Sequence, residues 1–274
     1  TNSFSHILIL EIMMTPPSVF IIFTLHMKLT LIGAGKLGNQ LYYEFVKHPS
    51  IELIEWIDRS SNSKQTAEGI KITKSLDSLQ KAEIYLMAVN DDAIPSVSSQ
   101  LPSNEFVIHT SGGTPMTAIS QKRKGVFYPI QSFSSNRTID FSQITFGLES
   151  TTENDFKILQ KLAQSLYAKT IQLNSLQRQG LHLAAVLVNN FTNHLFSHAA
   201  KVCEQNELSF DILQPLIQET VDRLNLISPD EAQTGPAIRR DQKTITEHLR
   251  IIEDPELKKL YQLLTKSIQN YHGS

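Results

Sequence analysis

A short glycine-rich segment has the residue types and the spacing that binding of two linked phosphates requires. Gly33-Ala34-Gly35-Lys36-Leu37-Gly38 follows an apolar run over residues 28–32 and opens a segment whose apolar residues recur at helical spacing. The first glycine permits a tight turn, the second lets the backbone approach a pyrophosphate, and the third lets the helix pack on the strand. The helix N-terminus adds free N–H groups and a partial positive charge. We predict a dinucleotide site over these six residues; the alternative is a turn that serves only the fold.

The end of the next predicted strand carries two conflicting signals for the kind of dinucleotide. Asp58 lies 20 residues after Gly38, where a carboxylate accepts hydrogen bonds from the adenosine ribose of NAD. Arg59 and Ser60 follow at once, and a guanidinium with a hydroxyl suits the 2′-phosphate of NADP. We favour NADP, with NAD as the alternative, because Arg59 can reach the phosphate if Asp58 turns away. The other interpretation of Arg59 is a solvated surface charge.

The loop after the apolar run 84–89 is a second candidate for the cofactor site. Ligands bind at the carboxyl ends of the strands in an open parallel sheet. We therefore predict that Asn90 and Asp91 contact the cofactor. The competing interpretation is that Asp91 or Asp92 only caps the next helix.

The loop after the apolar run 106–109 is the candidate for the substrate site. Ser111 supplies a hydroxyl, and Gly112 and Gly113 can bring backbone N–H groups close to a ligand. This combination suits a substrate carboxylate or carbonyl beside the nicotinamide. The alternative is a glycine-rich turn without a ligand.

A later helical segment carries polar side chains on an otherwise apolar stretch. His182, Val186, Asn189 and Asn193 share one helix face at spacings of four, three and four residues. Burial of such polar groups costs free energy unless they have partners. We predict that His182 exchanges a proton with the substrate and that Asn189 or Asn190 orients the substrate or the nicotinamide amide. The alternative for His182 is a satisfied core histidine.

Two other polar groups are weaker candidates. Arg239 could clamp an anionic substrate, although structural ion pairing near a helix start at Asp241 is the competing interpretation. His194 and His198 have the four-residue spacing of two metal ligands on a helix. Because no acidic third ligand follows at a useful spacing, we predict no metal site.

These groups need a scaffold that positions them, and the chain alternates strand and helix patterns from Met27 to about Leu173. Such alternation predicts a parallel sheet with right-handed crossovers. Beyond Leu173 the segment 176–206 indicates one long helix, apolar on every side over 183–188 and therefore buried all round. The predicted fold is α/β, with a Rossmann-type parallel sheet domain over residues 27–173 and an all-α domain for substrate and dimerisation over residues 174–274. The expected strands are 28–32, 51–57, 84–89, 106–109, 125–133, 144–148 and 169–173; the expected helices are 36–47, 153–167, 210–224, 241–252 and 255–271.

The composition fits a globular protein and sets the first residues apart. A formal net charge of −2 favours neither nucleic acid nor a membrane surface, and one cysteine excludes an internal disulfide. We expect a cytoplasmic protein that binds a small-molecule substrate. Residues 1–26 hold a single charged residue, and Pro16-Pro17 separates their two apolar runs. We interpret them as a non-native or disordered extension before a natural start at Met27; a membrane anchor is the alternative.

Taken together, several motifs resemble those of a bacterial family classed as NADP oxidoreductases. Its members join a Rossmann-like domain to a helical C-terminal domain of unassigned function. This architecture is similar to pyrroline-5-carboxylate reductase, ketopantoate reductase and the 3-hydroxyacid and 6-phosphogluconate dehydrogenases. The resemblance implies a cofactor cleft between the domains and a homodimer built through the helical domain, but it supplies no substrate. The motifs are Leu31–Gly38, Asn90–Ile94, His109–Gly113, Tyr128–Phe133, His182–Phe191 and Gly235–Asp241.

The chain departs from these relatives at two positions. Many relatives have His-Pro where this chain has Tyr128-Pro129. The hydroxyacid dehydrogenases carry a lysine proton donor on the long helix, where this chain has no lysine between Lys169 and Lys201 and His182 is the nearest substitute. We expect hydride transfer between NADP(H) and a small carbonyl, imine or hydroxy-acid substrate. The alternative is a dinucleotide-binding sensor or interaction protein without turnover.

Overall fold

The computed structural model describes residues 26–134 and 137–272. The chain divides into two compact units, Thr1–His182 and Leu183–Ser274. The N-terminal segment before residue 26 lies outside the described residues, so its interpretation stays a prediction. Within the described part of the chain, no helix is both long enough and apolar enough to cross a membrane.

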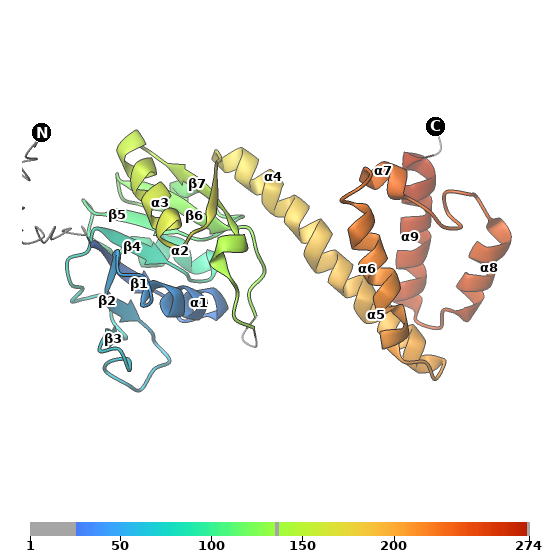
Figure 1. The fold of residues 1–274 in the computed structure, drawn as a ribbon, viewed down its shortest axis with the longest axis horizontal. Coiled ribbons are helices and arrows are strands. Elements are labelled where there is room, and N and C mark those ends of the chain that lie inside the picture. Colours follow the sequence, from blue (N-terminus) through green and yellow to red (C-terminus); the bar gives the residue numbers. More distant parts are fainter. Residues whose placement is uncertain (1–25, 135–136, 273–274) are drawn as a thin grey trace, which may run out of the picture. The chain divides into compact units, whose positions relative to one another are not determined.

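The first unit is built on an eight-stranded sheet in the order β3-β2-β1-β4-β5-β6-β7-β8 (Figure 1). The six strands from β3 to β6 run parallel, β7 pairs antiparallel with β6, and β8 is parallel to β7. The sheet confirms the predicted Rossmann-type α/β fold. Its strands are β1 (Met27–Ile32), β2 (Ile51–Ile57), β3 (Lys71–Thr73), β4 (Ile84–Met87), β5 (Phe106–His109), β6 (Lys124–Pro129), β7 (Thr145–Ser150) and β8 (Lys169–Gln172).

Two features of the sheet were not predicted. The short edge strand β3 has three residues, too few for a periodic pattern. At β7 the direction reverses, and the described residues that connect β6 to β7 form a loop with a 3₁₀ turn at Phe141–Gln143. A parallel return needs a longer crossover, usually a helix, whereas a loop suffices for an antiparallel neighbour.

The central strands are buried on both faces, as their continuous apolar sequences predict. In β4, Ile84 and Leu86 belong to one apolar cluster, and Tyr85 and Met87 belong to another. This alternation follows from the two-residue period of a strand. Helices α1 (Lys36–Phe45) and α3 (Glu153–Ser165) pack on the first cluster, and α2 (Ile94–Ser98) packs on the second. The sheet is therefore covered on both sides, and its loops at the carboxyl ends of the strands remain for a site.

A long helical segment leads from the sheet unit into the helical unit. α4 (Ser175–Ala185) continues through a π-helical turn, Val186–Phe191, into α5 (Thr192–Gln205). The prediction of one long helix is thus confirmed in extent, but the π-turn was not foreseen. Single π-turns inside α-helices occur frequently at functional sites. The remaining helices are α6 (Gln214–Arg223), α7 (Pro229–Ala232), α8 (Gln242–Ile251) and α9 (Pro255–Tyr271).

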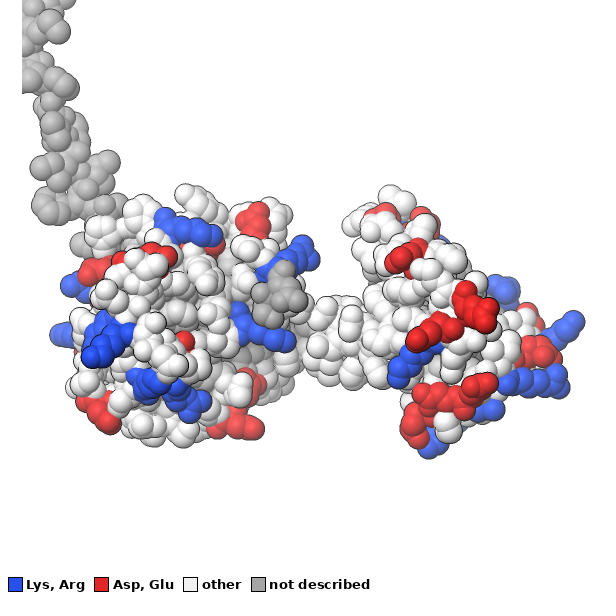
Figure 2. Space-filling view, turned by 90° about the horizontal axis from the view of Figure 1, so that it is seen from below, with Lys and Arg blue, Asp and Glu red and all other residues white. Residues whose placement is uncertain are grey.

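The prediction that residues 183–188 are buried all round is wrong for the single chain. Leu183 is 61% exposed and Val188 is 75% exposed. An apolar circumference indicates that a helix needs apolar neighbours, but it does not say which molecule supplies them. The segment 179–200 contains no Asp, Glu, Lys or Arg, and this uncharged stretch is white in Figure 2.

Candidate functional site

In the glycine turn after β1, two of the three glycines are required by close contacts of the backbone, and the third is not. Gly33 has φ +111°, and a Cβ there would lie 2.3 Å from the Ala88 carbonyl oxygen. A Cβ on Gly38 would lie 2.3 Å from the Gly33 carbonyl oxygen, so this glycine allows α1 to approach the turn closely. Gly35 has φ −69°, and a Cβ added there meets no atom within 4 Å. The backbone at Gly35 therefore faces open space that the fold itself does not use.

A tryptophan supports the turn from beneath. The indole N–H of Trp56, on β2, donates a hydrogen bond to the Gly33 carbonyl at 3.0 Å. The same indole stacks on the Tyr42 ring of α1, with centroids 4.3 Å apart and planes at 9°. Because this is the single tryptophan of the chain, the tryptophan fluorescence of the protein comes from a site in contact with the glycine turn.

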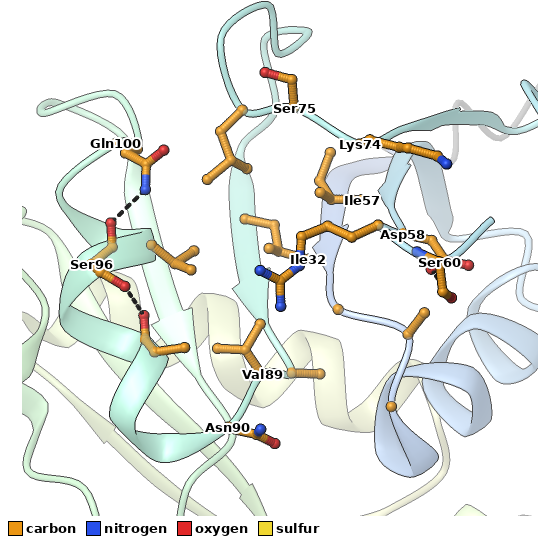
Figure 3. Close-up of a pocket in the computed structure, with 18 of the residues that line it drawn as sticks. Ile32, Ile57, Asp58, Ser60, Lys74, Ser75, Val89, Asn90, Ser96 and Gln100 are labelled. Carbon is orange, nitrogen blue, oxygen red and sulfur yellow. Dashed lines mark hydrogen bonds between the residues drawn. The ribbon is translucent and has the colours of Figure 1, made fainter. Parts of the chain in front are cut away.

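A cavity of about 560 Å³ opens beside the turn, between the loops that follow β1, β2, β3 and β4. It extends to α2 on its far side. Figure 3 shows Asn90 at one end of this space and Lys74 and Ser75 at the other. Of the predicted cofactor residues, those that line it are Gly33, Ala34, Gly35, Asp58, Arg59, Ser60 and Asn90.

The remaining residues of the glycine-rich segment have other surroundings. Leu37 packs against the apolar core, and Gly38 packs on the turn as described above. Lys36 is the first residue of α1 and is not part of the cavity wall.

The β2 end of the cavity carries both charges and hydroxyls. Asp58 turns into its own loop, where its Oδ1 accepts hydrogen bonds from the Ser60 backbone N–H at 2.9 Å and from the Ser60 hydroxyl at 2.6 Å. Figure 3 shows these two side chains lying together. Arg59 lines the cavity, and so does Lys74, which follows the edge strand β3. Lys74 was missed because β3 was missed; no sequence motif marks it.

Two loops at the carboxyl ends of β4 and β5 are joined by a side-chain hydrogen bond. The Ser111 hydroxyl donates to Asp91 Oδ2 at 2.7 Å and accepts from the backbone N–H groups of Gly113 and Thr114 at 3.1 and 2.9 Å. Asp91 therefore bonds Ser111 in place of the helix-capping interaction considered above; Asn90 occupies the N-cap position without a side-chain cap.

A buried arginine fixes the backbone of the same loop. Arg178 on α4 is fully buried and donates to the carbonyl oxygens of Ser111 at 3.0 Å and Gly112 at 2.8 Å. Its guanidinium also forms an ion pair with Glu149 on β7 at 3.2 Å. Sequence reasoning missed Arg178, although it lies four residues before His182 and so on the same helix face. That spacing was the available signal.

His182 meets a tyrosine at the end of β6. Its Nδ1 lies 3.3 Å from the Tyr128 hydroxyl, and the rings are nearly perpendicular at 80°. A Cβ on Gly113 would lie 3.6 Å from both Asp91 Oδ2 and His182 Cδ2, so the carboxylate and the imidazole flank that glycine. The structure thus brings together Ser111, Gly112, Gly113 and His182, and it adds Tyr128, which the motif pointed to only as a departure from His-Pro.

The other predicted site residues belong to the helical unit. Asn189 and Asn190 lie in the π-helical turn, and Arg239 precedes Asp241, which caps α8 through a hydrogen bond from the Thr244 backbone N–H at 3.1 Å. The helix start predicted at Asp241 is confirmed. The Nε2 atoms of His194 and His198 are 3.1 Å apart, and no group of three metal-ligating side chains occurs among the described residues.

The face of the sheet unit seen in Figure 2 carries both signs of charge. On the face seen in Figure 2, lysines and arginines alternate with aspartates and glutamates. This pattern agrees with the formal net charge of −2. No single-sign field dominates this face, so local groups rather than a broad potential must select a ligand.

Comparison with solved structures decides the family. A Bacteroides fragilis protein described as a "putative NADP oxidoreductase" is 32% identical, with a TM-score of 0.78; the match covers 92% of this chain and 100% of that one. The chain belongs to the same family. Residues 144–268 also match the domain of unknown function DUF2520. The predicted resemblance to an NADP oxidoreductase family with a Rossmann-like domain is therefore confirmed.

More distant structures share the fold. A reductive aminase from Aspergillus terreus in complex with NADPH and ethyl levulinate is 14% identical, with a TM-score of 0.68 over 90% of this chain and 95% of that chain. Pyrroline carboxylate reductase from Plasmodium falciparum with NADP bound is 15% identical, with a TM-score of 0.52 over 90% and 97% of the two chains. No curated protein is significantly similar to this chain in sequence.

Proposed function

We propose that this protein is an NADP-dependent oxidoreductase that transfers a hydride between the nicotinamide and a small carbonyl, imine or hydroxy-acid substrate. The observation that carries the proposal is the open backbone at Gly35 beside the 560 Å³ cavity. A turn that served only the fold would need Gly33 and Gly38 but not Gly35. Unused space at the second glycine is what a pyrophosphate requires.

The lining of the cavity supports NADP over NAD. One oxygen of Asp58 already accepts two hydrogen bonds from Ser60, so this carboxylate is held toward its own loop. Arg59 and Lys74 remain as cations on the cavity wall, where the Ser75 hydroxyl donates to Asp77, which also lines the cavity. A 2′-phosphate carries negative charge and accepts charge-assisted hydrogen bonds from such groups. Asn90 lines the opposite end of the cavity, and we expect it to contact the ribose nearer the nicotinamide.

The residues around Ser111 and His182 supply the groups that act on the substrate. NADPH itself supplies the hydride. The substrate binds beside the loop of Gly112 and Gly113, which is held in place by the bond between Ser111 and Asp91 and by the bond from the Gly113 N–H to the Ser111 hydroxyl. His182, whose ring borders Gly113, moves the proton. Asn189, Asn190 and Arg239 remain proposed contacts contributed by the helical unit.

We further propose that residues 174–274 form the substrate and dimerisation domain and that the protein is a homodimer. The support is the uncharged segment 179–200 with its exposed leucines and valine. Exposed apolar surface of this extent indicates a protein interface. Sedimentation at several concentrations tests the proposal: a monomer throughout would contradict it.

The test of the proposed reaction is NADPH oxidation against a panel of keto acids, simple ketones and cyclic imines. We expect turnover of at least one class, lowered about a hundredfold or more in His182→Ala, because a general acid contributes on that order. His248→Ala, in the helical unit, is the matched control and should keep full activity. Binding of NADPH without turnover of any compound would favour the sensor function instead.

A further inference from the structure

The pair formed by Tyr128 and His182 has a geometry that determines where the imidazole proton sits. Tyr128 is 7% exposed, and its hydroxyl lies 3.3 Å from His182 Nδ1. The absence of a side chain at Gly112 makes room for the pair, since a Cβ there would lie 2.6 Å from Nδ1 and 2.7 Å from Tyr128 Cζ. The two rings therefore meet through one polar contact.

The tyrosine is the donor in this contact. Burial raises the pKa of Tyr128, so the phenol keeps its proton at neutral pH. A buried hydroxyl proton needs an acceptor, and an unpaired buried donor is costly. Among the described side chains, Nδ1 of His182 is the acceptor within reach. If Nδ1 carried the proton instead, the phenol would lose its acceptor.

The charged neighbours are engaged elsewhere. Arg178 donates to the carbonyls of Ser111 and Gly112 and pairs with Glu149, while Asp91 accepts from the Ser111 hydroxyl. Neither takes the place of Tyr128 at Nδ1. The opposite edge of the imidazole faces Gly113: a Cβ on that glycine would lie 3.9 Å from Nε2.

We propose that Tyr128 is a positioning residue that keeps a proton on Nε2 of His182 and supplies a second proton to Nδ1 when the first is given up. In carbonyl reduction the hydride forms the new C–H bond, the Nε2–H bond breaks and the substrate oxygen gains that proton. The Tyr128 O–H bond then breaks as Nδ1 becomes protonated, which leaves a tyrosinate near the buried charge of Arg178. The catalytic role of this relay rests on the proposed function. The proposed position of the His182 proton on Nε2 does not depend on it.

The direct test is nitrogen NMR of protein labelled at histidine, which distinguishes the two imidazole tautomers without substrate. The His182 signals are assigned from their loss in His182→Gln, at a pH well above the ordinary histidine pKa. We expect the Nε2–H form in the wild-type protein. Tyr128→Phe removes only the hydroxyl and should lower the ratio of Nε2–H to Nδ1–H about two- to tenfold, as loss of one hydrogen bond predicts.

The chain offers a matched control. Tyr261 on α9 contacts His248 Nδ1 on α8 at 2.8 Å, a second tyrosine–histidine pair. Tyr261→Phe should change the His248 signals and leave those of His182 unchanged. A wild-type His182 with its proton on Nδ1, or a tautomer ratio unaffected by Tyr128→Phe, would overturn the proposal even if NADPH binds and turns over.

Steady-state kinetics supply a second test, which distinguishes a proton relay through Tyr128 from a purely structural role of this residue. Reduction of a carbonyl needs a proton on oxygen, whereas reduction of an already cationic N-alkyl iminium yields a neutral amine without one. Tyr128→Phe should therefore lower kcat for a ketone about tenfold or more with little change in KM, and spare an iminium substrate. Equal losses on both substrates would contradict the relay.

Discussion

Arg178 donates a hydrogen bond from its buried guanidinium to the Gly112 carbonyl at 2.8 Å, which ties α4 to the loop after β5. The same side chain reaches the Ser111 carbonyl and Glu149. One residue of the long helix therefore sets the backbone of the proposed substrate loop. Because its guanidinium is fully buried and bonded to Glu149 and two backbone carbonyls, Arg178 supports the site by holding the loop.

Removal of this arginine should be strongly destabilising. Arg178→Met leaves Glu149 and two carbonyl groups without their partner, and breaking a buried ion pair costs about 3–5 kcal/mol. Urea unfolding should show a lower midpoint with an unchanged slope. The double variant Arg178→Met with Glu149→Gln should recover part of the loss, because no buried charge is then left unpaired. A double variant as unstable as the sum of both single changes would contradict this account.

Gly35→Val should separate binding from folding. No atom lies within 4 Å of a Cβ at this position, and its φ of −69° suits any residue. We expect a change in unfolding free energy within about 0.5 kcal/mol, as for other surface substitutions. Calorimetry should nevertheless show loss of NADPH binding, because the side chain fills the space of the pyrophosphate.

The control for this variant is Gly38→Ala. Its Cβ would lie 2.3 Å from the Gly33 carbonyl oxygen, so the variant should lose stability as well as binding. Equal stability of the two variants would show that the glycines do not divide into structural and binding roles.

Acid should weaken the fold through His109. Its pKa is lowered to about 4 by burial and, secondarily, by the charge of Arg178. The unfolded chain therefore binds a proton below the ordinary histidine pKa of about 6.5 that the folded chain does not bind, and stability falls as the pH drops through this range. At about pH 5 the loss from this group is on the order of 2 kcal/mol. His109→Gln should reduce the difference between unfolding free energies at neutral and acidic pH; an unchanged pH dependence would contradict the assignment.

Cofactor preference should depend on the two cations of the cavity wall. Arg59→Ala and Lys74→Ala should each weaken NADPH binding about tenfold or more, the order expected for one charge-assisted hydrogen bond, while NADH binding changes little. Lys64→Ala, in the loop that contains Arg59 but outside the cavity lining, controls for general charge effects. Equal losses for NADPH and NADH would exclude a 2′-phosphate contact.

The sheet could be predicted because each strand is marked by residues that are neighbours in the sequence. The buried strands β4 and β5 are continuous apolar runs, and the glycine turn follows β1 directly. The short strand β3 and the short helix α7 carry too few residues for periodicity, although Ser228 and Glu231 form a capping box at the start of α7. The reversal of β7 depends on the length and content of a connection rather than on the strand itself.

The site was less predictable because its contacts join distant parts of the chain. Asp91 and Ser111 were both named, but no pattern shows that a carboxylate 20 residues away accepts a hydrogen bond from the serine hydroxyl. The sequence does not show that Arg178 binds the carbonyl groups of Ser111 and Gly112, because these residues lie more than 60 positions earlier in the chain. Such pairings depend on which loops the sheet order brings together.

Titration of the wild-type protein with NADPH, followed by the fluorescence of Trp56, tests the central claim most directly. The indole bonds the Gly33 carbonyl at 3.0 Å, so a dinucleotide on this turn must change its emission. We expect a saturable change that is stronger per mole of NADPH than of NADH and that Gly35→Val abolishes. No saturable change in the folded wild-type protein, or the same change in Gly35→Val, would contradict binding at the glycine turn.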